Sequence, residues 1–163
     1  MAKGQDRRVH RTQRLLREAL VALIREKGFE ALTVQDIFDR ANVGRATFYA
    51  HFDNKEDLLV SGFDELRTAL RERQTEALSR GGSMDERMLA FSHHIIVHVN
   101  DYRHVFRAMV GKHSGAMVQQ LMYKMLVDLV RDDMKTVVRR DTDSPIEAFV
   151  HFIAGALFGL LMW

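Results

Sequence analysis

The stretch "TVQDIFDRANVGRATFYAHF", residues 33–52, decides the fold class of this chain. Its first part, Val34 to Ala41, places apolar residues at i, i+3, i+4 and i+7, which form one stripe along a helix. The turn at residues 42–44 separates it from a second short helix over residues 44–52. Two short helices joined by a three-residue turn are typical of a helix-turn-helix.

Local signals mark where the helices of this region begin. Thr33 is expected to cap the first short helix, and Asp36 three residues later completes an approximate capping box. Asn54 is expected to cap a longer helix that follows. Upstream, Arg11–Lys27 shows helical spacing and stops at Gly28, so it predicts the first helix of a three-helix bundle. The predicted core of this bundle consists of Leu16, Leu20, Leu23, Phe29, Leu32, Val34, Ile37, Val43, Phe48 and Phe52.

The second short helix carries polar and aromatic side chains that a core does not need. In a helix-turn-helix this helix enters the DNA major groove. Arg45 could then donate to guanine O6 and N7, and the Thr47 methyl could contact a thymine methyl. Tyr49 and His51 suit phosphate oxygens, with Lys55 as a further cation. The alternative is an ordinary helical hairpin whose polar face is solvated.

The segment "TVQDIFDRANVGRATFYAHFDNKEDLL", residues 33–59, resembles the DNA-binding region of the tetracycline-repressor (TetR) family of transcriptional regulators. The resemblance is strong over Arg11–Leu59, and beyond these residues it consists of the helix order and the shape of the last segment. It implies that Thr33 contacts a phosphate and that Gln35 points toward a base. It also implies that Arg45, Ala46, Thr47 and Tyr49 face the groove. His51 and Lys55 would contact the DNA backbone. Gly44 departs from the family pattern, in which a Ser often caps this helix, and Ala50 is smaller than a contact residue could be.

Charge is distributed unevenly along the 163 residues. The net charge is +2, yet residues 1–52 hold ten Lys or Arg against six Asp or Glu. The first seventeen residues alone carry six basic residues and one acid, so they predict a basic arm that attracts a polyanion. A merely solvated arm is the alternative. With no Cys, disulfides and thiolate metal sites are excluded, and a reducing cytoplasm is the expected location.

The remaining sequence predicts an all-α chain of eight helices. One Pro in the whole chain and Gly residues mostly at segment ends argue against a turn-rich β fold. After the helix at residues 55–78 and a linker "SRGGS", helical spacing continues over 84–99, 102–110, 117–138 and 145–163. We therefore expect a helix-turn-helix domain at 1–52 and a larger helical domain at 53–163.

The resemblance implies that residues 53–163 sense a ligand and form a dimer. Nine Met residues are many for this length, and Met adapts to varied apolar ligands, although each could equally be ordinary core. A pocket, if present, is expected among Phe63, Leu66, Phe91, His94, Ile95, His98, Phe106, Met109, Leu121, Met122 and Met125.

No pattern in the chain predicts catalysis, a cofactor or a resident metal. His94 and His98 share a helix face, with Asp101 and His104 nearby, but no further ligand completes a metal site. A carboxylate-bridged di-iron bundle requires Glu-x-x-His twice, and the chain offers Asp101-x-x-His104 once. The expected partners are double-stranded DNA, a small effector and a second copy. A protein partner or metal ion acting on the larger domain is the alternative.

The last segment, residues 148–163, is apolar all round apart from His151, and Gly155 and Gly159 match a membrane helix-dimer motif. Its ~16-residue apolar run is shorter than the roughly 20 residues that span a bilayer, so we expect no membrane segment. Burial in a dimer interface through Phe152, Gly155, Phe158 and Gly159 is predicted instead, with burial inside the chain as the alternative. Since TetR relatives continue through one more helix, the domain is expected to be shortened at its C-terminal end.

Taken with the resemblance, these patterns predict a homodimeric regulator that reads a pseudo-palindromic operator. We expect a repressor that a small apolar or amphiphilic ligand releases from DNA. The ligand would favour an arrangement of the dimer whose half-site spacing no longer fits the operator.

Overall fold

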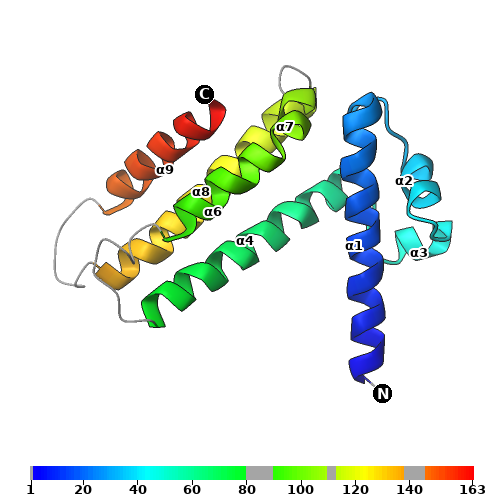
Figure 1. The fold of residues 1–163 in the computed structure, drawn as a ribbon, viewed down its shortest axis with the longest axis horizontal. Coiled ribbons are helices and arrows are strands. Elements are labelled where there is room, and N and C mark those ends of the chain that lie inside the picture. The colour runs from blue at the N-terminus through cyan, green and yellow to red at the C-terminus, as the bar shows by residue number, and fades with distance from the viewer. Residues whose placement is uncertain (1, 80–89, 110–112, 138–145) are drawn as a thin grey trace. The chain divides into compact units, whose positions relative to one another are not determined.

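The computed structural model describes residues 2–79, 90–109, 113–137 and 146–163 (Figure 1). Within these ranges it contains helices and no strands, which confirms the all-α prediction. The described helices are α1 (Ala2–Lys27), α2 (Val34–Arg40), α3 (Arg45–Tyr49), α4 (Lys55–Ser79), α6 (Ala90–Asp101), α7 (Arg103–Met109), α8 (His113–Val137) and α9 (Ile146–Met162).

The helices are grouped in two compact units. The first contains Met1–Gly62 and His104–Ala116, and the second contains Phe63–Arg103 and Met117–Trp163. The predicted boundary between residues 52 and 53 therefore differs from the division by contacts. The physical reason is that the first turns of α4 pack with the helix-turn-helix, where Leu58 is fully buried.

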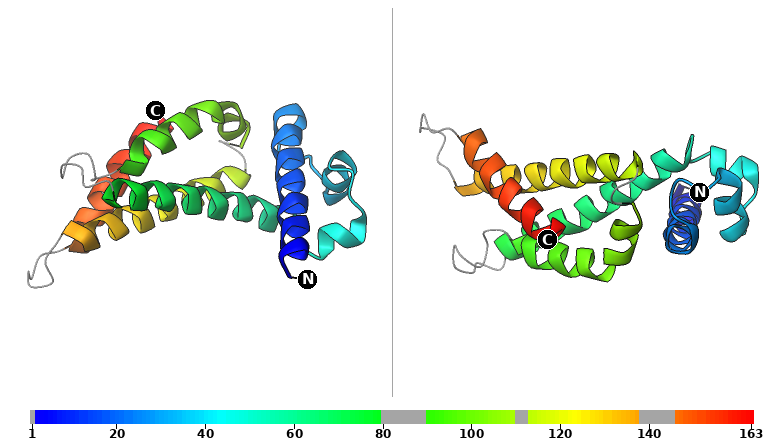
Figure 2. Two further views of the ribbon diagram at one scale, coloured as in Figure 1. Left: turned by 60° about the horizontal axis from the view of Figure 1, so that its bottom comes forward. Right: turned by 90° about the horizontal axis from the view of Figure 1, so that it is seen from above.

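The core of the first unit is the apolar side of α1 against α2 and α3, which lie beside it (Figure 2). Leu16, Ile37 and Phe48 are completely buried at its centre. Most of the predicted core is buried as expected, while Val34 and Val43 are only half-buried at its edge. Burial of about ten large apolar side chains at ~1.5–3 kcal/mol each holds the small domain together.

Helix α1 begins nine residues earlier than the sequence pattern predicted. The prediction placed its start at Arg11 because the apolar stripe begins there, and assigned the preceding residues to an arm. The structure has a helix from Ala2 onward. The helix extends this far because Ala, Lys, Gln and Arg favour a helix, and Gly4 is the least favourable residue in this segment.

The other boundaries agree with the sequence within about two residues except at three places. Helix α3 ends at Tyr49 instead of residue 52. Helix α8 begins at His113 instead of residue 117, since Ser114 and Gly115 continue the helix before its first apolar pair. The predicted helix over 84–99 is seen from Ala90 onward, and its first residues lie outside the described ranges. Asn54 Oδ1 accepts the Asp57 amide at 2.7 Å, which confirms it as the cap of α4.

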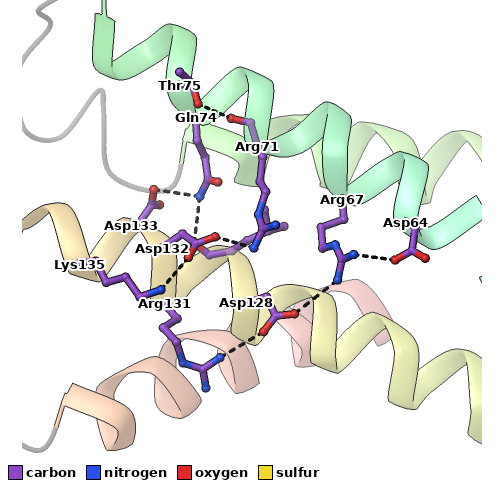
Figure 3. A network of polar contacts seen from close by, with 11 residues as sticks. Asp64, Arg67, Arg71, Gln74, Thr75, Asp128, Arg131, Asp132, Asp133 and Lys135 are labelled. Atoms are coloured by element: carbon purple, nitrogen blue, oxygen red, sulfur yellow. Dashed lines mark hydrogen bonds and ion pairs between the residues drawn. The ribbon is translucent and has the colours of Figure 1, made fainter.

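In the second unit, α4 and α8 run side by side in the same direction and are joined by polar side chains (Figure 3). Arg67 pairs with Asp128 at 3.7 Å, and Arg71, one turn later, pairs with Asp132 at 2.7 Å. Further along, the buried Gln74 amide donates to the Leu129 carbonyl and to Asp133 Oδ1 at 3.0 and 2.9 Å. The side chains of Gln74 and Asp133 are 5% and 4% exposed, so these bonds lie inside the unit.

Helix α9 is antiparallel to α8 and contacts it at two places along its length. Arg131 forms a two-pronged ion pair with Glu147, at 3.0 and 2.9 Å. This contact lowers the pKa of the Glu147 carboxyl, chiefly through the hydrogen bond from Arg131. One to three turns further along α9, the rings of His151 and Phe158 contact Tyr123.

Candidate nucleic-acid interface

The turn between α2 and α3 is a Schellman motif built on Asn42. Asn42 has φ 53°, a left-handed conformation that Asn tolerates better than most residues. Its amide donates to the Asp39 carbonyl at 3.1 Å, and the Val43 amide donates to the Phe38 carbonyl at 3.0 Å. This pair of bonds ends α2 sharply and sets the angle at which α3 leaves.

Helix α3 begins at Gly44 without a side-chain cap. The Gly44 backbone is extended, with φ −70° and ψ 151°, and its carbonyl accepts the Thr47 and Phe48 amides. Nothing in this conformation requires glycine. A Cβ placed there would meet Thr47 Oγ1 at 3.8 Å, an ordinary contact distance. The departure from the resembled family pattern thus leaves the helix intact but less strongly capped.

One side of α3 anchors the helix and the other is open. Phe48 is fully buried and lies edge-on to the Tyr49 ring, 5.4 Å between ring centres. Arg45, Ala46, Thr47 and Tyr49 are exposed, and their contact with a DNA groove stays a prediction. The Arg45 guanidinium lies 5.6 Å from the centre of the Tyr49 ring, a cation–π distance that orders both side chains. His51 is half-buried beside Phe52 at the helix end.

Thr33 and Gln35 are exposed at the start of α2. The capping box predicted from the sequence is confirmed, because Thr33 Oγ1 accepts the Asp36 amide and Asp36 Oδ2 accepts the Thr33 amide at 2.8 Å. Lys27 at the end of α1 pairs with Asp36 Oδ1 at 2.8 Å. Together Lys27 and Thr33 hold the pKa of the Asp36 carboxyl far below its usual range. The start of α2 is therefore tied to the end of α1.

A second ion pair joins α1 to the end of α2. Arg40 donates to both oxygens of Glu26, at 2.8 and 2.6 Å. The hydrogen bond from Arg40 lowers the pKa of Glu26, and the carboxylate in turn raises the pKa of the Arg40 guanidinium. Sequence reasoning did not predict this pair, since the partners are 14 positions apart on different helices.

Lys55 was predicted to hold a DNA phosphate, but the structure gives its ammonium group partners inside the domain. Its Nζ donates to the carbonyls of Phe29 and Leu32 at 2.9 and 2.8 Å, with the Glu30 carbonyl at 3.4 Å. An ammonium group has three donors, so these carbonyls occupy them. The contact between Lys55 and a DNA phosphate stays a prediction, and in this structure the ammonium group has no free N–H donor for it.

A basic stripe, which we define as Arg7, Arg11 and Arg14, runs along the first half of α1. The three side chains are exposed and recur at i, i+4 and i+7, so they lie on one helix face. Arg14 also pairs with Glu18 at 3.2 Å, which ends the stripe. The charge was predicted to lie on an arm, whereas the structure places these arginines in a row on a helix.

The predicted pocket residues do not all belong to one unit. Phe106 and Met109 lie in the first unit and the other nine lie in the second. Phe91, Ile95, Met122 and Met125 are buried, whereas His94 is exposed and therefore does not line an interior. His98 stacks on Tyr102 with ring centres 4.5 Å apart, and burial lowers its pKa.

Three large apolar side chains are exposed on α9. We call Phe149, Phe152 and Leu160 the α9 apolar face. Their side chains are 55%, 73% and 55% exposed, and their spacing places them on one side of the helix. Of the predicted interface residues, Phe152 and Gly159 are exposed. Gly155 is half-buried. Phe158 instead turns its edge to Tyr123, 5.7 Å away, and contributes to packing within the unit. Sequence reasoning missed Phe149 and Leu160, although their spacing from Phe152 could have revealed them.

A short second helix with an exposed polar face, set by a tight turn on a three-helix core, defines a helix-turn-helix DNA-binding protein. Residues 16–61 match the family model of "Bacterial regulatory proteins, tetR family". The helix-turn-helix part of this chain is therefore of the type found in the TetR family of transcriptional regulators.

Individual relatives agree with this assignment. The fatty acid metabolism regulator protein of Bacillus subtilis is 32% identical over 105 residues, which cover 64% of this chain and 48% of the relative. An Escherichia coli protein with the name "Probable acrEF/envCD operon repressor" is 36% identical over 84 residues, which cover 50% of this chain and 36% of the relative. The chain thus spans about half of these relatives or less. A TetR transcriptional regulator from Streptococcus agalactiae shares the fold over the whole chain and 87% of its own, with a TM-score of 0.61 and 23% identity.

These relatives are regulators and not enzymes, which supports the prediction that the chain has no catalytic activity. In the part of the chain that the structure describes, no cluster of three or more His, Asp or Glu could hold a metal ion. No helix in the described ranges is both long enough and apolar enough to cross a membrane.

Proposed function

We propose that this chain is a homodimeric repressor that binds a pseudo-palindromic operator and is released from it by a small apolar or amphiphilic ligand. The observation that carries the proposal is the exposed face of α3, where Arg45, Ala46, Thr47 and Tyr49 stand on the second helix of a helix-turn-helix. That helix enters the major groove in proteins of this architecture.

Each exposed residue of this face has a distinct role in the proposal. Arg45 donates to guanine O6 and N7, and the Thr47 methyl contacts a thymine methyl. Gln35 reaches a base edge from α2. Tyr49 and His51 donate to phosphates and fix the register, and Thr33 contacts a phosphate at the start of α2. The small Ala46 lets the helix backbone approach the base edges.

The basic stripe on α1 supports a polyanionic partner. Arginines held in a row on a helix can each neutralise a phosphate, which adds affinity without sequence preference. This contribution falls steeply with salt because each contact releases condensed counterions.

Dimerisation is supported by the α9 apolar face. Monomeric proteins rarely expose neighbouring large apolar side chains, and such patches commonly mark protein interfaces. A second copy of the same helix would cover both faces at once, since a two-fold interface pairs a surface with itself. Two recognition helices would then read two half-sites related by the same symmetry.

A ligand site in the second unit is supported by the buried Phe91, Met122 and Met125. Met and Phe side chains adapt to apolar ligands. The name of the Bacillus subtilis relative makes fatty acids and their derivatives the first compounds to screen. Repression is supported by the Escherichia coli relative, which is described as an operon repressor. A DNA partner also supports a cytoplasmic location.

The test is selection of bound duplexes from a random DNA pool at near-physiological salt. We expect an enriched inverted repeat, and Arg45→Ala run in parallel should lose preference at one position of each half-site. Bound DNA without an enriched motif would contradict sequence-specific regulation. With the repeat in hand, fatty acids of increasing chain length are added to the preformed complex. Release that depends on chain length supports the ligand class, and no release by any of them would contradict it.

A further inference from the structure

The α1–α2 loop, which we define as residues 28–32, receives polar contacts from two helices outside the helix-turn-helix. The loop, the first turns of α4 and the start of α8 all belong to the first unit. Phe29 and Leu32 are each 3% exposed, so the loop is anchored in the core of that unit. It leads directly into Thr33, the cap of α2.

The first contact comes from Lys55, the first residue of α4. Its ammonium group donates to the carbonyls of Phe29 and Leu32 and lies 4.7 Å from the centre of the Phe29 ring. The Phe29 carbonyl also accepts the Leu32 amide at 3.2 Å. The Lys55 ammonium group therefore binds both ends of the turn at residues 29–32 and connects the loop to α4.

The second contact comes from the start of α8. Glu30 Oε1 accepts both the Ser114 amide at 2.9 Å and the Ser114 hydroxyl at 2.7 Å. Ser114 is 4% exposed and is the second residue of its helix. Amides in the first helical turn have no acceptor within the helix. Glu30 supplies that acceptor, and a carboxylate is favoured at a helix N-terminus.

These contacts meet on one short loop from two different directions. Glu30 lies between the two carbonyls that Lys55 binds, so a displacement of α8 at Ser114 acts on the same backbone that Lys55 holds. The next residue with a defined role is Thr33, whose cap starts α2. A movement of α4 or α8 thus reaches α2 through five residues of loop.

We infer that Lys55 and Glu30 are positioning residues for DNA binding, which join the first turns of α4 and α8 to the α1–α2 loop. Through this loop both helices set the position of α2, and with it the turn and the recognition helix α3. The inference rests on the proposed function for its biological meaning. Its physical content is a coupling between sites, which can be measured without DNA.

The test is amide hydrogen exchange on the full chain. Glu30→Ala should accelerate exchange at Ile37 and Ala41 in α2, and Lys55→Met should accelerate exchange at Ser114, which Lys55 does not touch. We expect at least about a fivefold change in each, the lower end of typical coupling between sites. Lys55→Arg keeps donors and should restore near-normal exchange, which guards against a variant that simply folds poorly.

Two matched controls separate coupling from general loosening. Glu18→Ala removes an exposed acid from α1, and Lys124→Met removes an exposed lysine from α8. Neither should change exchange in α2 or at Ser114. If Glu30→Ala and Lys55→Met affect only the residues that they contact, the inference is overturned.

DNA binding gives an independent readout of the Lys55 role. If Lys55 positions the helices, Lys55→Met weakens binding to the selected operator while the salt slope stays unchanged. A direct phosphate contact would instead weaken all sequences alike and reduce the slope by about one, which would overturn the assignment. If no operator is found, the proposed function fails, and the exchange measurement alone still decides the coupling.

Discussion

The Arg45 guanidinium carbon lies 5.6 Å from the ring centre of Tyr49, one turn later on the exposed side of α3. The contact restricts both side chains in the free protein, so less side-chain entropy would be lost in the proposed complex with DNA. Phe48 is buried on the opposite side of α3 and anchors the helix in the core, so the position of the Arg45–Tyr49 pair is fixed.

The first prediction concerns this pair. Arg45→Ala should cost about 1–3 kcal/mol of operator affinity and relax the preference at one base pair, since a bidentate contact to guanine is lost. Arg45→Lys keeps the charge but loses the planar fork, so it should recover non-specific binding only. Competition binding against operators changed at single positions measures both effects. An equal loss on every sequence would show that Arg45 contacts phosphate.

The second prediction concerns the uncapped start of α3. Gly44→Ser should raise the free energy of unfolding by a few tenths of a kcal/mol, because the hydroxyl can accept an amide of the first turn. There is room for it, since an added Cβ meets Thr47 Oγ1 at 3.8 Å. Gly44→Ala is the control, because it adds the same Cβ without an acceptor. Urea unfolding should rank Ser above Ala by about 0.5–2 kcal/mol, and equal values would contradict the prediction.

The third prediction concerns the buried amide of Gln74 (Figure 3). Gln74→Leu should destabilise the second unit by about 1–3 kcal/mol, because Asp133 stays buried after losing a donor. Arg71→Leu breaks an ion pair whose partners are 45% and 34% exposed, and should cost at most about 1 kcal/mol. Both are measured by urea unfolding. If Arg71→Leu costs as much as Gln74→Leu, exposure does not govern these contacts.

The fourth prediction is a pH dependence at the start of α2. The pKa of Asp36 is depressed in the folded chain, mainly by hydrogen bonds from Lys27 and Thr33, relative to an ordinary value of 3.8. Its contribution to stability is therefore complete above that value and is lost as pH falls toward the folded pKa. Thermal unfolding at several pH values should show Asp36→Asn less stable than the natural chain near neutrality, with the difference shrinking in acid. Asp39→Asn, on the same helix, should show no such convergence.

The fifth prediction concerns assembly. Phe152→Asp should convert the proposed dimer to a monomer while leaving helix content unchanged, because the side chain is 73% exposed and contributes little within the chain. Thr68→Asp places the same charge on an exposed position of α4 and should leave the dimer intact. Sedimentation equilibrium distinguishes the species. A Phe152→Asp dimer as stable as the natural one would exclude the α9 apolar face as the interface.

Much of the DNA-binding domain could be predicted because its signals are local. The caps at Thr33 and Asn54 involve partners three residues away, and the stop at Gly28 depends on its own φ of 78°. Apolar spacing placed Ile37 and Phe48 in the core correctly. Such features depend on residues within about one helical turn, so the linear sequence contains them.

The set of helices, most of their ends and the polar surface of α3 therefore follow from local sequence. The partners of the charged and aromatic residues depend instead on tertiary packing. Lys55 donates to carbonyls of the α1–α2 loop, and Glu30 accepts hydrogen bonds from Ser114, 84 positions away. Phe158 contacts Tyr123 within the chain, whereas Phe149 is exposed. Long side chains can reach several partners, and the choice among them depends on how distant helices pack, which local spacing does not encode.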